Sequence, residues 1–262
     1  MSHPILTALL AFGMMTALWP LSVRLHDVSI IDILWAPAFA ILAWSYVLVP
    51  PPLGLRGWIA LALITVWGLR LGVHILARWH RLGHEDYRYA EIRRRNGPNF
   101  PLTSLVWIFW LQAVLLYVIS WSLQAALSAS NPLNAGDVAA TAMIVAGIVI
   151  EAMADAQLTR FRADPDNGGK VLDSGIWAWS RHPNYFGDFL MWWGFFVLGI
   201  AAGGPWWTIL GPIAMSALLI HYSGADLMED TIKHRRPGYA EYVRRTSFFF
   251  PWPPRGASRL IR

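Results

Sequence analysis

The sequence contains no cysteine and few charged residues. Of its 262 residues, 14% are charged, whereas soluble domains usually carry about a quarter. Without cysteine the chain has neither a disulfide framework nor a cysteine-ligated metal or redox centre. The chain is instead 56% hydrophobic and holds 16 tryptophans. This composition indicates an integral membrane protein and argues against a disordered chain or a fibre.

The nucleotide and metal motifs of many soluble enzymes are also missing. No glycine fingerprint of the Rossmann type, no phosphate loop ending in G-K-[ST] and no H-E-x-x-H occurs. D-P-D-N-G at 164–168 matches a calcium loop only in part, because the later glutamate is lacking. We therefore expect no metal site. The net charge of +5 lies in short segments between apolar runs, which indicates membrane topology and not nucleic-acid binding. No protein partner is evident.

Seven stretches are apolar and long enough, or nearly so, for a helical crossing, which needs about 20 residues. They are residues 4–23, 30–50, 57–77, 103–127, 138–158, 185–201 and 205–223. The first lacks a basic start and a small-residue cleavage site, so we expect a span and not a cleavable signal peptide. The sequence thus predicts an all-α polytopic membrane protein with seven transmembrane helices.

Basic residues are distributed unevenly among the connecting segments. Most arginines follow the third and fifth predicted helices or lie in the C-terminal segment, whereas the alternate loops contribute Arg56 alone. By the positive-inside rule the arginine-rich segments face the cytoplasm, and seven crossings then put the N-terminus outside. We expect one membrane domain, 1–262, with substrate-side helices in 1–130, cofactor-binding helices in 138–251 and a tail at 252–262.

The densest polar cluster is S-R-H-P-N-Y-F-G-D at 180–188, directly before an apolar run. Pro183 disfavours helix at the residue before it, so we expect an extended approach and a helix that begins near Asn184. A helix N-terminus and the guanidinium of Arg181 both suit phosphate. Asn184 and Asp188 are four apart and share a helix face. A capped helix start with interfacial Arg and Tyr side chains explains the stretch equally well.

Further acidic residues lie near the same predicted membrane face. Glu151 and Asp155 share a face of the fifth predicted helix, where acids are costly and usually functional. An internal ion pair is the simpler alternative. Asp226 follows the last predicted helix, and its position suits a ribose or amide partner. Glu229 and Asp230 are better explained as a solvated face that pairs with nearby basic side chains.

Four ionisable residues in the first half are candidates for chemistry. Asp32 lies just inside the second predicted helix, Arg70 and His74 are four apart in the third, and Tyr87 belongs to E-D-Y-R-Y. A mutual Asp32–Arg70 ion pair and a packing role for His74 are simpler accounts. The arginines after the third helix would equally bind anionic lipid head groups.

Several strings resemble the superfamily of steroid 5α-reductases and sterol reductases, over about 151–251. They are A-D-A-Q at 154–157, F-R-A-D-P at 161–165, S-G-I-W-A-W-S-R-H-P-N-Y-F-G-D at 174–188 and Y-V-R-R-T-S-F-F-F-P-W at 242–252, together with Asp226. The whole chain resembles a bacterial branch of unknown function, of which E-D-Y-R-Y and I-D-I-L-W are typical. R-H-P-N-Y-x-G-D is fairly specific, whereas R-H-P-x-Y is shared with isoprenylcysteine methyltransferases.

The resemblance implies a seven-helix enzyme of the bacterial inner membrane that holds NADPH in a cavity open to the cytoplasm. It implies hydride transfer to the C=C bond of a lipidic enone, as in 3-oxo-5α-steroid 4-dehydrogenases. The residues that it assigns by position to the cofactor site are Asp155, Gln157, Arg162, Trp177, Arg181, His182, Asn184, Tyr185, Asp188 and Asp226.

The substrate half departs from the steroid 5α-reductase pattern. The second predicted helix contains neither the Gln nor the Glu that, with a Tyr, bind the substrate carbonyl there. Reduction of an enone needs a hydrogen-bond donor where negative charge develops on oxygen. The candidates in this chain are Asp32, Arg70, His74 and Tyr87.

Two other functions remain open at this stage. A membrane methyltransferase that uses S-adenosylmethionine would share R-H-P-x-Y. Its sulfonium cofactor has no phosphates, so the arginines and Asp188 count against it. A transporter or lipid-binding protein would place polar groups near the bilayer midplane, whereas here most lie near one face.

Overall fold

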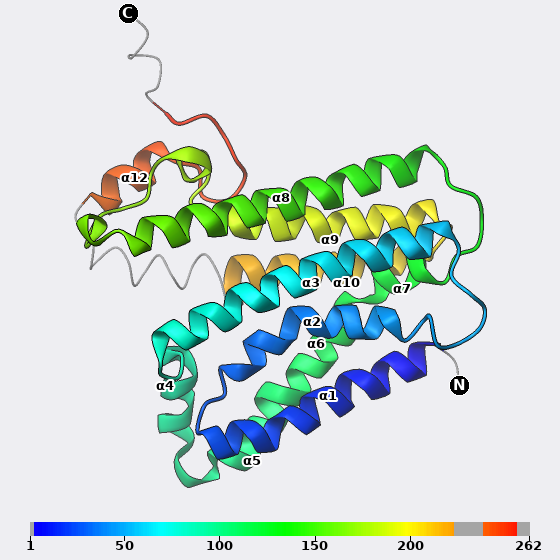
Figure 1. The fold of residues 1–262 in the computed structure, drawn as a ribbon, viewed down its shortest axis with the longest axis horizontal. Coiled ribbons are helices and arrows are strands. Elements are labelled where there is room, and N and C mark those ends of the chain that lie inside the picture. Colours follow the sequence, from blue (N-terminus) through cyan, green and yellow to red (C-terminus); the bar gives the residue numbers. More distant parts are fainter. Residues whose placement is uncertain (1–2, 223–237, 256–262) are drawn as a thin grey trace, which may run out of the picture. The chain divides into compact units, whose positions relative to one another are not determined.

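The computed structural model describes residues 3–222 and 238–255, and these are helical apart from turns and extended links (Figure 1). No strand occurs among them, although Ser180 and Ser247 form one isolated parallel bridge. Asp226, Glu229 and Asp230 lie outside the described residues. The predicted all-helical class is thus confirmed for the described part.

The helices follow one another along the chain, and the segment at 164–182 contains two of the short 3-10 helices. The α-helices are α1 (His3–Leu25), α2 (Ile30–Trp44), α3 (Leu55–Leu82), α4 (Tyr87–Asn96), α5 (Phe100–Ser104), α6 (Leu111–Ile119), α7 (Trp121–Leu127), α8 (Ala135–Ala163), α9 (Pro183–Ala201), α10 (Leu210–Ala217) and α12 (Tyr239–Arg245). Short 3-10 helices are η1 (Gly97–Asn99), η3 (Pro165–Asn167), η4 (Gly175–Ala178) and η5 (Trp206–Ile209). Two π-helical segments are η2 (Leu105–Trp110) and η6 (Leu218–Tyr222).

Four helical stretches of the described chain are long and apolar enough to cross a membrane. They are His3–Leu25, Leu55–Leu82, Tyr87–Ile119 and Ala135–Ala163. Ile30–Trp44 and Trp206–His221 are apolar but shorter. Helix α9 has 19 residues, and its first turns include the polar Asn184 and Asp188. The protein is therefore a helical membrane protein, while the count of seven spans and the orientation of its termini stay predictions.

The contacts divide the chain into two compact units. The first unit comprises Met1–Asp137 with Leu198–Gly211, and the second comprises Val138–Val197 with Pro212–Arg262. The assignment of a single membrane domain stays a prediction.

In the first unit, α2 and α3 pack closely along their lengths (Figure 1). A Cβ at Gly68 of α3 would lie 2.8 Å from the carbonyl oxygen of Ala36, and one at Gly72 would lie 2.6 Å from Pro37 Cγ. Glycine at these two positions lets the two backbones approach, as is common where membrane helices cross. This packing buries the large side chains of Phe39 and Trp67.

The second unit is organised by the crossing of α8 and α9. A Cβ at Gly147 would lie 2.5 Å from the carbonyl oxygen of Gly187, and one at Gly187 would lie 2.6 Å from the backbone nitrogen of Glu151. Both glycines are therefore required for the two helices to touch through their backbones. The indole of Trp193 donates to Ser216 Oγ at 3.2 Å, which joins α9 to α10.

Candidate functional site

The cluster at 180–188 forms the link into α9 and its first turns. Helix α9 begins at Pro183, which confirms the predicted start near Asn184. Proline suits the first helical position because its ring presets φ and its missing N–H has no helical partner there. Ahead of it, the N–H of Arg181 donates to the carbonyl oxygen of Ser247 at 2.9 Å. Ser180 forms an isolated bridge with Ser247, and Arg181 and His182 lie outside any helix, so the approach to Pro183 is non-helical.

Buried polar side chains gather around this helix start. Glu151 and Asp155 of α8 are buried, as are His182 and Asp188. Asn184 Nδ2 donates to Asp155 Oδ1 at 3.5 Å, which links the start of α9 to α8. Since burial of carboxylates is costly, such a concentration of acids at one helix crossing marks a candidate site.

Two of the predicted cofactor residues contact the backbone around η4. Gln157 Oε1 accepts the N–H of Ile176 at 3.2 Å, and Trp177 Nε1 donates to the carbonyl oxygen of Ala154 at 3.1 Å. Gly175 has a φ of +60°, and a Cβ there would lie 2.5 Å from Gln157 Oε1. These contacts hold the loop before α9 against α8.

Aromatic rings surround the polar side chains of the stretch. The His182 and Tyr185 rings are stacked with centroids 5.8 Å apart, and Phe248 meets His182 edge-on at 5.4 Å. The guanidinium of Arg181 lies 5.2 Å from the centre of the Phe248 ring. A cation over an aromatic face is attracted by the ring quadrupole, so Phe248 orients Arg181.

The segment 247–255, which we call the strap, returns from α12 to the same loop. Ser180 Oγ donates to the carbonyl oxygen of Phe249 at 2.7 Å. The N–H of Trp252 donates to the carbonyl oxygen of Trp179 at 2.9 Å. Figure 1 shows α12 beside the loop that connects α8 and α9. Sequence reasoning placed residues 247–252 of the strap within a matching string, counted 252–255 as part of the tail, and assigned none of these residues to the site.

Arg162 lies at the end of α8, beside a small hollow of about 190 Å³. The hollow is also lined by Asp164, Asn167 and Gly169. Asn167 Nδ2 donates to the carbonyl oxygen of Phe161 at 3.1 Å, which holds the loop after α8 against the last turn of the helix. Of the ten predicted cofactor residues, nine belong to the described part of the second unit.

The four catalytic candidates all belong to the first unit. Asp32 is half-buried; its Oδ1 accepts the hydroxyl of Tyr89 at 2.8 Å, and its Oδ2 lies 3.5 Å from Arg88 Nη2. Tyr89 and Arg88 are residues that sequence reasoning passed over, although both stand in E-D-Y-R-Y. The string E-D-Y-R-Y drew attention to this segment. It does not indicate which of its two tyrosines contacts Asp32 of α2.

The other three candidates differ in exposure. Tyr87 is 58% exposed, while Arg70 and His74 are half-buried on α3. Asp32 forms an ion pair with Arg88, which belongs to α4.

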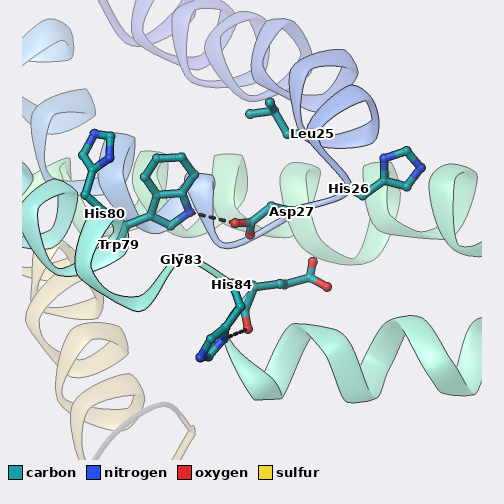
Figure 2. A pocket seen from close by; sticks show the side chains of 8 residues that line it. Leu25, His26, Asp27, Trp79, His80, Gly83 and His84 are labelled. Atoms are coloured by element: carbon teal, nitrogen blue, oxygen red, sulfur yellow. Dashed lines mark hydrogen bonds between the residues drawn. The ribbon is translucent and has the colours of Figure 1, made fainter.

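A larger hollow opens in the first unit near the link from α3 to α4 (Figure 2). It has a volume of about 410 Å³ and is lined by Leu25, His26, Asp27, Trp79, His80, Gly83, His84 and Glu85. Figure 2 shows the Trp79 indole directed at Asp27, to which Nε1 donates at 2.7 Å. Glu85 binds Arg93 through two hydrogen bonds of 3.0 and 2.8 Å. No group of three or more His, Asp or Glu residues in the described chain is arranged to hold a metal ion.

Asp86 follows Glu85 in the sequence and is the N-cap residue of α4. Burial works to raise the pKa of Asp86, but hydrogen bonds from Arg88 and the charges of Arg88 and Arg78 outweigh it, so that the pKa lies below its ordinary value. Its Oδ1 caps α4 by accepting the N–H of Arg88 at 3.0 Å. An acid at a helix N-terminus is stabilised in its charged form.

Comparison with known proteins places the chain in a family. Residues 18–246 match the model of a family described as "Protein of unknown function (DUF1295)", and the chain belongs to that family. An uncharacterized protein of Schizosaccharomyces pombe is 27% identical over 270 residues, covering 93% of this chain and 78% of the relative.

Two named reductases are more distant relatives. The Delta(14)-sterol reductase erg24 of S. pombe is 29% identical over 147 residues, which cover 50% of this chain and 32% of the reductase. The Delta(14)-sterol reductase erg24B of Aspergillus fumigatus is 39% identical over 67 residues, 21% of this chain and 13% of the reductase. No solved structure matches the chain significantly. The resemblance to the sterol reductase superfamily is thus supported; these relatives are fungal, so the bacterial assignment stays a prediction.

Proposed function

We propose that this protein is a membrane reductase that uses NADPH to reduce the C=C bond of a hydrophobic enone, steroid-like or otherwise lipidic. The coarser part of this proposal, kinship with membrane reductases that act on sterols, follows from the two named relatives. The observation that carries the finer part is the gathering of Asp155, His182 and Asp188 in buried positions at the start of α9.

The chemistry of this donor and acceptor set fits a phosphorylated dinucleotide. A guanidinium beside a helix N-terminus offers positive charge and N–H groups to phosphate, and Arg181 is separated from the first residue of α9, Pro183, by His182 alone. Ribose hydroxyls and a carboxamide need short polar partners, which Asp155 and Asn184 provide. Asp188 adds an acceptor one helical turn beyond Asn184.

NADPH, when bound, supplies the hydride. The residues of the second unit have the tasks of binding and orientation: Arg181 neutralises phosphate, and Gln157 and Trp177 hold the loop ahead of α9 by their contacts with backbone groups. The proton donor stays a prediction, with Asp32, Arg70, His74 and Tyr87 as candidates. Among them Asp32 is held by the Tyr89 hydroxyl at 2.8 Å.

Loss of the Arg181 charge tests the cofactor proposal. Titration of the purified protein with NADPH and NADH, followed by tryptophan fluorescence, should show that Arg181→Ala weakens NADPH more than NADH, by about tenfold, because a charged contact to the extra phosphate is lost. Arg160→Ala removes an exposed arginine at the end of α8 and serves as the matched control. Equal losses for both nucleotides would place Arg181 on the pyrophosphate.

A second arm separates the proposal from its alternatives. If S-adenosylmethionine binds and NADPH does not, the protein is a methyltransferase and the reductase proposal fails. Consumption of NADPH in the presence of a steroid enone in lipid vesicles would identify the reaction. We place the site on the cytoplasmic side of a bacterial inner membrane, where the arginine-rich segments point by the positive-inside rule.

A further inference from the structure

The strap contacts the loop of the candidate site through the main-chain groups of Trp179 and Arg181. The N–H of Arg181 donates to Ser247 at 2.9 Å, and the N–H of Trp252 donates to Trp179 at 2.9 Å. Ser180 and Ser247 form the parallel bridge between the two segments. The strap therefore acts on the loop as an added strand acts on a sheet edge, with backbone bonds that do not depend on side-chain identity.

Ser180 is the side chain that joins the strap to the helix start. It is 0% exposed. Its hydroxyl donates to the carbonyl oxygen of Phe249 at 2.7 Å and accepts the N–H of His182 at 3.1 Å. The Ser180 hydroxyl thus bonds the carbonyl oxygen of Phe249 in the strap and the N–H of His182 in the loop at the same time. Both groups are buried with it, so loss of the hydroxyl leaves two backbone groups without this partner.

Tyr242 of α12 holds the other end of the same loop. Its hydroxyl donates to the carbonyl oxygen of Trp177 at 2.7 Å and lies 3.4 Å from that of Ser180. The strap also brings Phe248 to the Arg181 guanidinium and Phe249 to the Phe186 ring of α9, whose centroids are 6.2 Å apart. Docking of the strap and the conformation of the loop at 177–182 are consequently linked.

We propose that Ser180 is a positioning residue that couples docking of the strap to dinucleotide binding at the start of α9. This inference rests on the proposed function. Because coupling between two events is reciprocal, a docked strap that favours dinucleotide binding must in turn be held more firmly when the dinucleotide is bound. The absence of cysteine from the chain makes this reciprocity measurable, since one introduced cysteine accepts one label.

The experiment uses the full chain in detergent with a spin label at Trp252→Cys, a position that is 69% exposed. In the labelled protein with Ser180 intact, NADPH should immobilise the label. In Ser180→Ala the label should be more mobile without nucleotide, and NADPH affinity should fall about tenfold, as expected for a buried group that loses its partner. Ser180→Thr keeps the hydroxyl and should restore both properties.

Two further variants guard against simple misfolding. Ser128→Ala removes a hydroxyl that bonds the carbonyl oxygen of Gln124 in the first unit and should change neither reading. Tyr242→Phe removes one hydroxyl from the loop contact and should loosen the label and weaken NADPH in the same direction as Ser180→Ala. If Ser180→Ala does not fold, Tyr242→Phe decides the question alone.

The outcomes separate the inference from the function on which it rests. If the protein with Ser180 intact does not bind NADPH, the proposed function fails, and the coupling with it. If that protein binds NADPH but folded Ser180→Ala and Tyr242→Phe bind it equally well, the coupling alone is overturned. The coupling is also overturned if NADPH leaves the mobility of the label unchanged.

Discussion

The guanidinium of Arg56 donates to both carboxylate oxygens of Asp137, at 2.6 and 2.8 Å, although 81 residues separate the two in sequence. The side chains are 1% and 4% exposed. Arg56 Nη1 also donates to Asn131 Oδ1 at 2.7 Å and Nη2 to the carbonyl oxygen of Pro132 at 3.1 Å. The basic residue that sequence reasoning counted as a loop charge is thus a buried connection between α3 and the start of α8.

Removal of one partner of this pair should destabilise the protein strongly. Asp137→Ala leaves the Arg56 charge buried without its carboxylate, which costs about 3 kcal/mol when a buried pair is broken. Arg56→Met combined with Asp137→Leu should cost less than the two single changes together, because neither charge is then left alone. Thermal unfolding in detergent measures Asp137→Ala, the single changes Arg56→Met and Asp137→Leu, and their combination. If the combined loss equals the sum of those two single losses, the pair is not coupled.

The crossing of α8 and α9 should not tolerate a methyl group at Gly147. Alanine there would place Cβ 2.5 Å from the carbonyl oxygen of Gly187 and 2.7 Å from the backbone nitrogen of Met191. Backbone atoms cannot rotate away as a side chain does, so we expect a loss of about 2 kcal/mol or more.

Gly13 supplies the matched control for this change. It lies within α1, and a Cβ there has nothing within 4 Å. Gly13→Ala should leave the melting temperature unchanged or raise it, because alanine is the better helix former by about 0.5–1 kcal/mol. A melting temperature that falls equally in both variants would contradict the role of Gly147 in the crossing.

The two tyrosines of E-D-Y-R-Y should respond differently to loss of their hydroxyls. Tyr89 donates to Asp32 at 2.8 Å, whereas Tyr87 is 58% exposed. Tyr89→Phe should lower the free energy of unfolding by about 1–2 kcal/mol, since it takes a hydrogen bond from a half-buried carboxylate. Tyr87→Phe should stay within about 0.5 kcal/mol of the unchanged protein. Urea titration followed by tryptophan fluorescence measures both, and equal effects would mean that the Tyr89–Asp32 contact is not stabilising.

Asp86 should make stability depend on pH in the acidic range. Its pKa is lowered in the folded protein, so its contribution is present above the unfolded value of about 3.9 and is lost as the pH falls through the folded value. Above about pH 5 the difference in melting temperature between the unchanged protein and Asp86→Asn should stay constant, and below about pH 4 the unchanged protein should approach the variant. A difference between the two that stays constant down to the lowest pH would exclude this role for Asp86.

The start of α9 could be predicted from the sequence because its signals are local. Proline at the first helical position, polar residues before an apolar run, and the polar pair Asn184 and Asp188 four residues apart depend on neighbours along the chain. Pro183 begins the helix, and Asp155 is buried, as expected for an acid within an apolar segment. The helical class of the described chain was predicted from the length of its apolar runs, which is likewise a local property of the sequence.

The partners of these residues were beyond the reach of sequence reasoning. Tyr87 and Tyr89 are two residues apart, and spacing alone does not tell which of them turns towards Asp32. Nothing in the sequence indicates that Ser180 and Ser247 are neighbours, yet the bridge between them joins the strap to the loop of the candidate site. Such pairs depend on how distant segments are packed, which no local pattern encodes.

By itself the sequence determined that this is a helical membrane protein with a polar cluster at one helix start, since composition, hydropathy and proline act within a few residues. The tertiary structure alone decided which charges are matched and which backbones touch. Arg56 pairs with Asp137, and the backbones of α8 and α9 contact at Gly147 and Gly187. Burial stabilises such distant groups only where their charges and shapes are complementary.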